Sequence, residues 1–251
     1  MLFASPVASD SANFRPVGEV LDGLDGVFAR AKRPGRIDAC PCCLRPDKIE
    51  VLLRRPRKML SADDIRQYAT VAMLGAGSAA DLRYFTPRIL ELCHTGEMDF
   101  PDIEIVYDHM RRADWESWPE APAIVELMNA LWAEVLARYP DSDDPGVLLC
   151  AFGTATGSVV PNLASWSCLE TAAAVHSLRD FLSDHVVLRH GTLVPDNPFW
   201  DTAGNAHHEV VRWLNGGEAG RAVDRILARG TDDHDLSRSL VESRAVLSGC
   251  A

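Results

Sequence analysis

The chain has 251 residues, of which 47% are hydrophobic, and it carries a formal net charge of −11. This length and composition are enough for one or two hydrophobic cores, which excludes disorder of the whole chain. No apolar run reaches the roughly 18 residues that a membrane-spanning helix needs, so we expect no membrane partner. The first sixteen residues lack the features of a secretory signal, and we therefore expect a cytoplasmic protein.

The charge is unevenly distributed along the sequence. Residues 1–60 contain eleven Lys or Arg and seven Asp or Glu, whereas the remainder contains fourteen and twenty-nine. Because phosphate binding requires a basic surface, the acidic remainder argues against nucleic acid as a partner. The basic run Arg54–Lys58 contains Pro56, which favours a solvated loop. The pattern favours another protein, one with a basic surface, as the partner.

Apolar spacing predicts helices along most of the chain. Residues 1–15 are rich in Ser, Ala and Pro and are expected to form an irregular arm. From Val17 onward, apolar residues recur at three- and four-residue steps, which is typical of a helix, here ending near Pro34-Gly35. Further helices are expected over residues 47–54, from Ser61 to about 74, from Ser78 to 92, over 101–112 and over 118–139.

Two of these helix starts resemble capping boxes with Asp in place of Glu. Ser61 precedes Asp64 by three residues, and Ser78 precedes Asp81 in the same way. The loop between these two helices is short, so the helices must lie antiparallel or sharply bent. Pro87 lies inside the second helix and predicts either a kink or a helix start at that residue.

The second half of the chain continues the helical pattern. After the loop 140–145, where a subdomain boundary could fall, helical spacing covers 146–154, 166–184, 203–214, 217–229 and 234–247. Val186–Leu188 could form a strand, but a single strand has no sheet to join. We therefore predict an all-α fold with residues 16–251 in a single helical domain. Helix pairs at roughly forty-residue intervals predict paired antiparallel helices in a HEAT-like α-solenoid or an irregular helical bundle.

Three further features occur together in this sequence. They are the cluster Cys40-Pro-Cys-Cys43, the segment Pro87-Arg88-Ile-Leu-Glu-Leu92 and a spaced series of tryptophans. In this combination and order they resemble a family of bacterial helical proteins that has no assigned activity. The chain differs at Leu74-Gly75, where that family has a tryptophan–glycine turn. The resemblance covers nearly all of the chain after residue 38 and implies a shared helical fold without supplying any chemistry.

The cysteine cluster is the most specific local motif. Cys40 and Cys43 have the C-x-x-C spacing with which two thiolates bind one zinc ion at about 2.3 Å. A closed structural site needs two more ligands, for which Cys93 and His94 are the candidates and Cys42 is the alternative. The cysteines could instead be reduced thiols packed as small hydrophobic groups. A redox role is the third alternative, although the thioredoxin-type motif needs a βαβ setting that this sequence lacks.

Candidate interaction residues are fewer. Trp115 and Trp118 flank a loop, where their rings could either anchor an interface or pack in the core. Arg88 could pair with Glu91 to fix helix packing, or it could hold an acidic group in a groove. Trp132 and Trp213 lie on apolar helix faces and are predicted to be core residues.

Two classes of function fit these observations. The chain has no G-x-S-x-G, P-loop or H-E-x-x-H motif, which favours a non-enzymatic protein-interaction module, immunity-like or adaptor-like, with an acidic binding face. The alternative is a zinc-binding protein or metal-dependent enzyme centred on Cys40 and Cys43. A structural zinc is the one cofactor that the sequence suggests.

Overall fold

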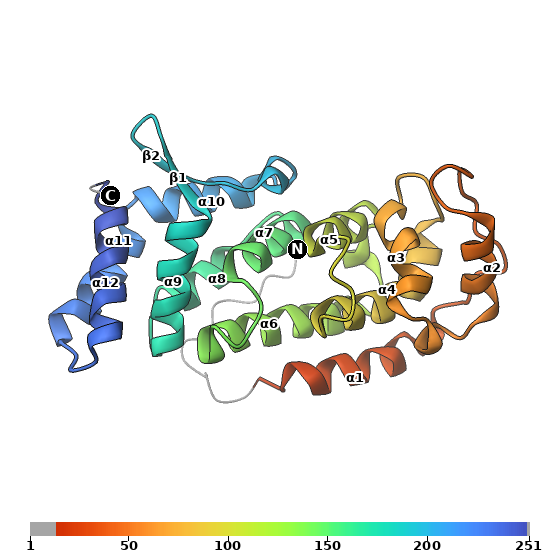
Figure 1. The fold of residues 1–251 in the computed structure, drawn as a ribbon, viewed down its shortest axis with the longest axis horizontal. Coiled ribbons are helices and arrows are strands. Elements are labelled where there is room, and N and C mark those ends of the chain that lie inside the picture. The colour runs from red at the N-terminus through yellow and green to blue at the C-terminus, as the bar shows by residue number, and fades with distance from the viewer. Residues whose placement is uncertain (1–13, 250–251) are drawn as a thin grey trace. The chain divides into compact units, whose positions relative to one another are not determined.

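The computed structural model describes residues 14–249 of the chain (Figure 1). The arm predicted over residues 1–15 lies outside these residues except for its last two positions. None of the helices in the described part has both the length and the hydropathy that a membrane crossing requires. The helices and strands are α1 Val17–Val27, α2 Pro46–Arg54, α3 Ala62–Val71, α4 Ala79–His94, α5 Ile103–Arg112, α6 Ala121–Arg138, α7 Pro145–Thr156, α8 Val160–Trp166, α9 Ala172–Asp184, β1 Val186–Arg189, β2 Thr192–Pro195, α10 Asn205–Asn215, α11 Glu218–Arg229 and α12 His234–Leu247.

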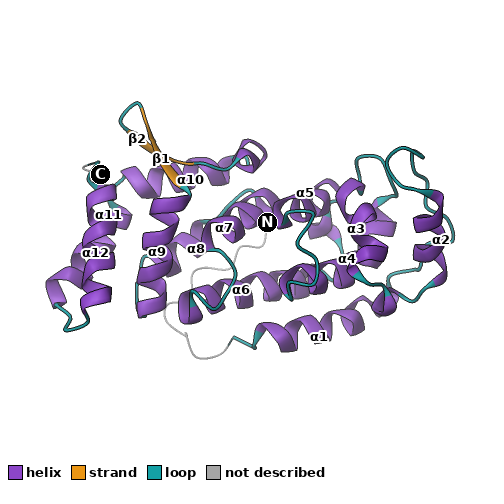
Figure 2. Ribbon diagram, in the orientation of Figure 1, coloured by secondary structure: helices purple, strands orange, loops and turns teal. Residues whose placement is uncertain are grey.

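The described residues are mostly helical, which confirms the predicted class, and they also contain one small β-hairpin (Figure 2). The chain divides into two compact units, with the boundary between Met128 and Asn129, inside α6. We call residues 16–128 the first unit and the residues from 129 onward the second unit. A single domain over 16–251 stays a prediction, because compactness alone does not show whether a unit folds independently.

The first unit is built on helix starts that the sequence predicted. Ser61 accepts a hydrogen bond from the Asp64 amide, and the Asp64 carboxylate accepts one from the Ser61 amide. Ser78 and Asp81 form the same reciprocal pair at the start of α4. Both capping boxes are therefore confirmed. The helices that they open pack against each other, and α4 also packs against α1 and α5 (Figure 1).

A buried arginine joins separate segments of this unit. The Arg57 guanidinium donates to the Asp25 carboxylate at 2.5 Å and to the Asp25 carbonyl at 2.7 Å. It also donates to the carbonyls of Phe28 and Tyr84, and it lies over the Tyr84 ring. The side chain is only 8% exposed, so its donors have to be satisfied by acceptors within the protein.

The second unit has an aromatic centre. The fully buried Trp166 ring lies 5.2 Å from the ring of Trp132 and 5.6 Å from that of Trp213. Each indole N–H donates a hydrogen bond. Trp132 donates to Ser165 and Trp213 donates to Ser167, whereas Trp166 donates to Ser177 and to the Ala174 carbonyl. The predicted core positions of Trp132 and Trp213 are confirmed, because both rings are buried and both indole N–H groups have acceptors.

The hairpin corrects one expectation. β1 was expected to have no partner, but it pairs antiparallel with β2 across the two-residue connection His190-Gly191. Both connecting residues have positive φ, 51° and 77°, as the tight primed turns of hairpins require. The turn was missed because histidine at its first position is not among the usual turn residues.

Two other helix predictions also need correction. The helix expected over 166–184 begins later, at Ala172, because Trp166 is the last residue of α8, Leu169 adopts a left-handed conformation with φ 47° and Thr171 caps the start of α9. The helix start that was one possibility at Pro87 is wrong, because α4 begins at Ala79 and continues through Pro87. The last predicted helix, 234–247, is confirmed as α12.

Candidate metal centre

The cysteine loop is held in place by the connection between α3 and α4. The Cys40 amide donates to the Gly75 carbonyl at 3.0 Å, and the Gly77 amide donates to the Asp38 carbonyl at 2.8 Å. A Cβ atom at Gly75 would lie 2.9 Å from the Cys43 sulfur, which is closer than such atoms approach. Glycine at position 75 therefore lets the two loops approach this closely.

A tight turn within the loop gathers the thiols. The amides of Cys43 and Leu44 both donate to the Cys40 carbonyl, at 2.9 and 3.0 Å. Gln67 on α3 donates from its side chain to the Cys43 carbonyl at 3.2 Å. Leu44 is fully buried and anchors the end of the turn just before α2 begins. The loop's shape is thus fixed by backbone hydrogen bonds and one apolar anchor.

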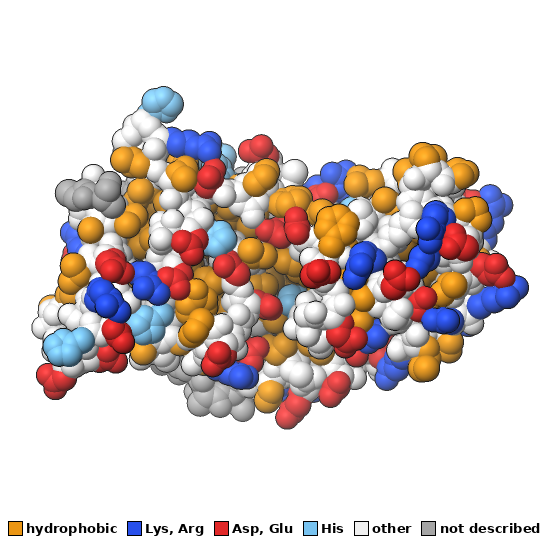
Figure 3. Space-filling model, viewed as in Figure 1, with side chains coloured by type: hydrophobic (Ala, Val, Ile, Leu, Met, Phe, Trp, Pro, Cys, Tyr) orange, Lys and Arg blue, Asp and Glu red, His pale blue; other side chains and the backbone are white. Residues whose placement is uncertain are grey.

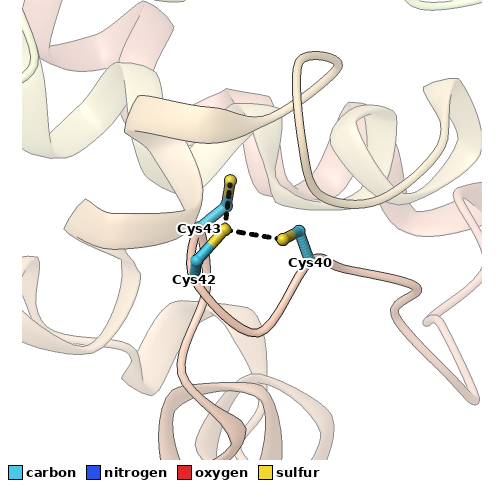
Figure 4. A group of neighbouring side chains, drawn as sticks. All are labelled: Cys40, Cys42 and Cys43. Atoms are coloured by element: carbon cyan, nitrogen blue, oxygen red, sulfur yellow. Dashed lines mark hydrogen bonds between the residues drawn. The ribbon is translucent and has the colours of Figure 1, made fainter.

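Cys40, Cys42 and Cys43 bring their sulfur atoms together at this turn. The three sulfurs lie within 4.8 Å of one another, with Cys40 and Cys42 exposed and Cys43 half-buried. The Cys42 sulfur lies 2.6 Å from that of Cys40 and 3.7 Å from that of Cys43 (Figure 4). We call these three residues the thiol cluster. Among residues 14–249, it is the one group of three or more Cys, His, Asp or Glu side chains that could together hold a metal ion.

The three thiols influence one another's ionisation. Hydrogen bonds from the Cys42 thiol and amide lower the pKa of Cys40. The same contact, together with the charge on Cys40, raises the pKa of Cys42 to about 11. The Cys40 thiolate therefore forms more readily, while Cys42 keeps its proton until a positive charge favours its loss. A bound cation would provide that charge.

The geometry and the donor set of the thiol cluster fit a thiophilic metal. Two thiolates that bind one tetrahedral zinc ion at about 2.3 Å lie about 3.8 Å apart. The Cys42–Cys43 separation of 3.7 Å matches this distance, whereas Cys40 has to move outward by about 1 Å. An all-sulfur donor set selects zinc or softer ions over magnesium or calcium. Three protein ligands leave one coordination position open, as in catalytic zinc sites and unlike closed structural ones.

The structure groups the predicted ligands differently from the sequence. Cys42, the alternative ligand, lies with Cys40 and Cys43, whereas Cys93 and His94 are not members of this group. Both are at the last turn of α4, where the His94 ring lies 6.4 Å from that of Tyr107. Their role as zinc ligands stays a prediction. The signal for Cys42 was present in the sequence as three cysteines within four positions.

The predicted interaction residues lie elsewhere in the first unit. Trp115 is 2% exposed and Trp118 is 7% exposed, and Trp118 donates its indole N–H to the Ala113 carbonyl. Arg88 forms the ion pair with Glu91 at 2.8 Å and donates to the Leu60 carbonyl. An interface role for these residues stays a prediction. The contacts seen here are all within the unit.

The chain was compared with family models, with curated proteins and with solved structures, and none of them matches it. The geometry and chemistry of the thiol cluster are therefore the basis for its function.

Proposed function

We propose that this protein binds a thiophilic metal ion, zinc in the first place, through Cys40, Cys42 and Cys43. The observation that carries the proposal is the convergence of three sulfurs from one tight turn, with no other ligand type beside them. Each thiol releases its proton when it binds the metal, and the charge of the metal ion then offsets the repulsion among the three thiolates. The three residues would be ligands, and a water molecule or a partner's side chain would take the fourth position.

The surroundings of the cluster support binding that does not require refolding. Two loops are already joined by the Cys40–Gly75 and Gly77–Asp38 hydrogen bonds. The turn is therefore preorganised, and two of its three thiols are open to solvent. A metal ion can reach the site without unfolding the unit. Binding should stabilise the unit according to metal concentration, by about 2.7 kcal/mol when the free metal is at 100 times its Kd.

The test is zinc titration of the reduced, metal-free protein against a chromophoric chelator of known affinity. We expect one zinc ion per chain in the unaltered protein and at least about a tenfold weaker affinity in Cys42→Ser and Cys43→Ser, since each loses one of three ligands. Cys168→Ser is the matched control, because Cys168 is also an exposed free thiol but lies outside the cluster. Equal zinc affinity in all four proteins would overturn the proposal.

A second proposal, protein binding through an acidic surface, is supported by the charge of the second unit. From residue 129 onward the sequence has sixteen Asp or Glu against nine Arg and no Lys. A basic protein is the partner that this charge favours, and an immunity-like or adaptor-like role would use it. On the face drawn in Figure 3, acidic and basic side chains are interspersed, so a partner there would meet charges of both signs.

This second proposal includes a HEAT-like arrangement of the helix pairs as one way to present a long binding face. A cytoplasmic location is consistent with both proposals, since free thiols persist in a reducing compartment. Chemical crosslinking of the protein in its native extract, with crosslinks mapped to residues, tests protein binding. Crosslinks to one basic protein, concentrated after residue 129, support it. An absence of such crosslinks, or crosslinks confined to the first unit, would contradict it.

A further inference from the structure

The two sulfur–sulfur separations in the thiol cluster are unequal. Cys40 and Cys42 are 2.6 Å apart at sulfur, closer than the roughly 3.8 Å between thiolates sharing a zinc ion. Cys43 is farther, at 3.7 Å from Cys42. The first two thiols are exposed, whereas Cys43 is half-buried with its sulfur against Gly75. One pair therefore combines proximity with access to small oxidants.

We propose that Cys40 and Cys42 form a reversible disulfide that expels the metal ion, so that the thiol cluster binds metal only when reduced. This inference rests on the proposed metal site and adds its regulation. A disulfide between these two residues leaves Cys43 as the one remaining thiolate. A single thiolate cannot hold the ion that three held, so oxidation and metal binding exclude each other.

A peroxide is the class of oxidant that balances the reaction. The thiolate of one cysteine attacks a peroxide oxygen, the O–O bond breaks, and hydroxide leaves and takes up a proton to give water. The sulfur that attacked the peroxide is now a sulfenic acid. The second thiolate attacks this sulfur, the S–O bond breaks, and the leaving hydroxide takes up a second proton. Two cysteine sulfurs have then lost two electrons, and the peroxide has been reduced to two molecules of water.

The return step needs a reduced dithiol, which cells supply. A dithiol thiolate attacks one sulfur of the Cys40–Cys42 disulfide and forms a mixed disulfide, and its second thiol then releases the restored cysteine pair. The dithiol is oxidised and the cluster is reduced. The exposure of both sulfurs allows this attack without unfolding.

The test treats zinc-loaded and metal-free protein with hydrogen peroxide in a Cys250→Ser background, because Cys250 lies outside the described residues. Tryptic cleavage after Arg36 and Lys48 yields one peptide that contains all three thiols. In the otherwise unaltered protein we expect this peptide to lose two hydrogen atoms while zinc is released, and a small dithiol should reverse both changes. A peptide that keeps its hydrogens while zinc stays bound would overturn the inference and leave metal binding intact.

Single variants separate this inference from the proposed function. Cys43→Ser should bind zinc at least about tenfold more weakly but should still form the disulfide. Cys42→Ser should form an intrapeptide disulfide at least about tenfold more slowly, since Cys40 then has only the half-buried Cys43 as a partner. Disulfide formation as fast in Cys42→Ser as in the unaltered cluster would contradict the assigned pair. If Cys43→Ser forms the disulfide but the unaltered protein binds no zinc, the metal site is contradicted. The proposed regulation of metal binding by the disulfide is then contradicted as well.

Discussion

The two units bury their polar groups in different ways. In the first unit, ionisable side chains such as Arg57 and His109 are buried and bind carbonyls from distant segments. In the second unit, the centre is aromatic, and its buried donors are indole N–H groups that bind hydroxyls or carbonyls. A buried carboxylate, Glu209, lies outside this centre and accepts from Ser158 and the Val159 amide. Buried charge makes the first unit sensitive to lost partners and to pH, whereas the aromatic centre of the second unit should be sensitive mainly to lost volume.

Removal of the central indole tests the volume dependence of the second unit. Trp166→Ala should lower the free energy of unfolding by about 3–5 kcal/mol, because a fully buried ring is replaced by a cavity. Urea unfolding followed by circular dichroism measures the loss. Trp166→Phe retains most of the ring contacts and should cost less. A loss below about 1 kcal/mol in the alanine variant would mean that the aromatic centre does not determine the unit's stability.

Loss of the buried guanidinium tests the first unit. Arg57→Leu should also destabilise by about 3–5 kcal/mol, because Asp25 and two backbone carbonyls lose their hydrogen bonds to the buried guanidinium. The matched control is Arg54→Leu, which removes an exposed arginine paired with Glu50. The control should change stability by less than about 1 kcal/mol. Equal effects in the two variants would show that the buried Arg57 contributes no more to stability than an exposed arginine does.

Acidification should distinguish the first unit through His109. Burial lowers the pKa of His109, whose Nδ1 donates to the Ala69 carbonyl at 3.1 Å. The unfolded chain takes up a proton as the pH falls through about 6.5, and the folded chain does not until its lower pKa is reached. Stability from this group is therefore present above pH 6.5 and is lost as the pH falls below it.

Urea unfolding at several pH values between 7.5 and 5.5 measures this loss. His109→Gln should flatten the pH dependence over that window, whatever it does to stability at pH 7.5. His234→Gln removes an exposed histidine and should leave the slope unchanged. An unaltered slope in His109→Gln would contradict the prediction.

The smallest expected effect concerns the hairpin of the second unit. His190 has φ 51° immediately before Gly191, a conformation in which asparagine is favoured. His190→Asn should therefore raise the free energy of unfolding, by at most about 1 kcal/mol. Measurement against the parent by urea unfolding shows the sign. A destabilised variant would mean that the histidine makes a contact more important than the turn conformation.

The parts of the fold that the sequence predicted are those set by local chemistry. Ser61 and Ser78 were recognisable because a capping box needs only residues three positions apart. The break at Leu169 and the turn at His190-Gly191 were missed, because a left-handed conformation is uncommon in residues other than glycine and the types of Leu169 and His190 do not by themselves indicate it. Local pattern could not reveal these two positions.

The candidate site was predictable in the same limited sense. The C-x-x-C spacing pointed to Cys40 and Cys43, since a tight turn brings such residues together. The inclusion of Cys42 depends on side-chain directions in the turn, and the close approach of Gly75 depends on a loop 32 residues farther along the sequence. The spacing of the cysteines in the sequence determines neither the side-chain directions in the turn nor the approach of Gly75.

X-ray absorption at the zinc edge counts most directly the sulfur atoms that bind the metal ion. For the zinc-loaded, reduced protein we predict three sulfur neighbours at about 2.3 Å and one lighter atom at about 2.0 Å. Cys43→Ser with excess zinc should lose one sulfur, whereas Cys168→Ser should keep all three. A zinc environment of nitrogen and oxygen alone, or one that Cys43→Ser leaves unchanged, would contradict the assignment of the thiol cluster as the metal centre.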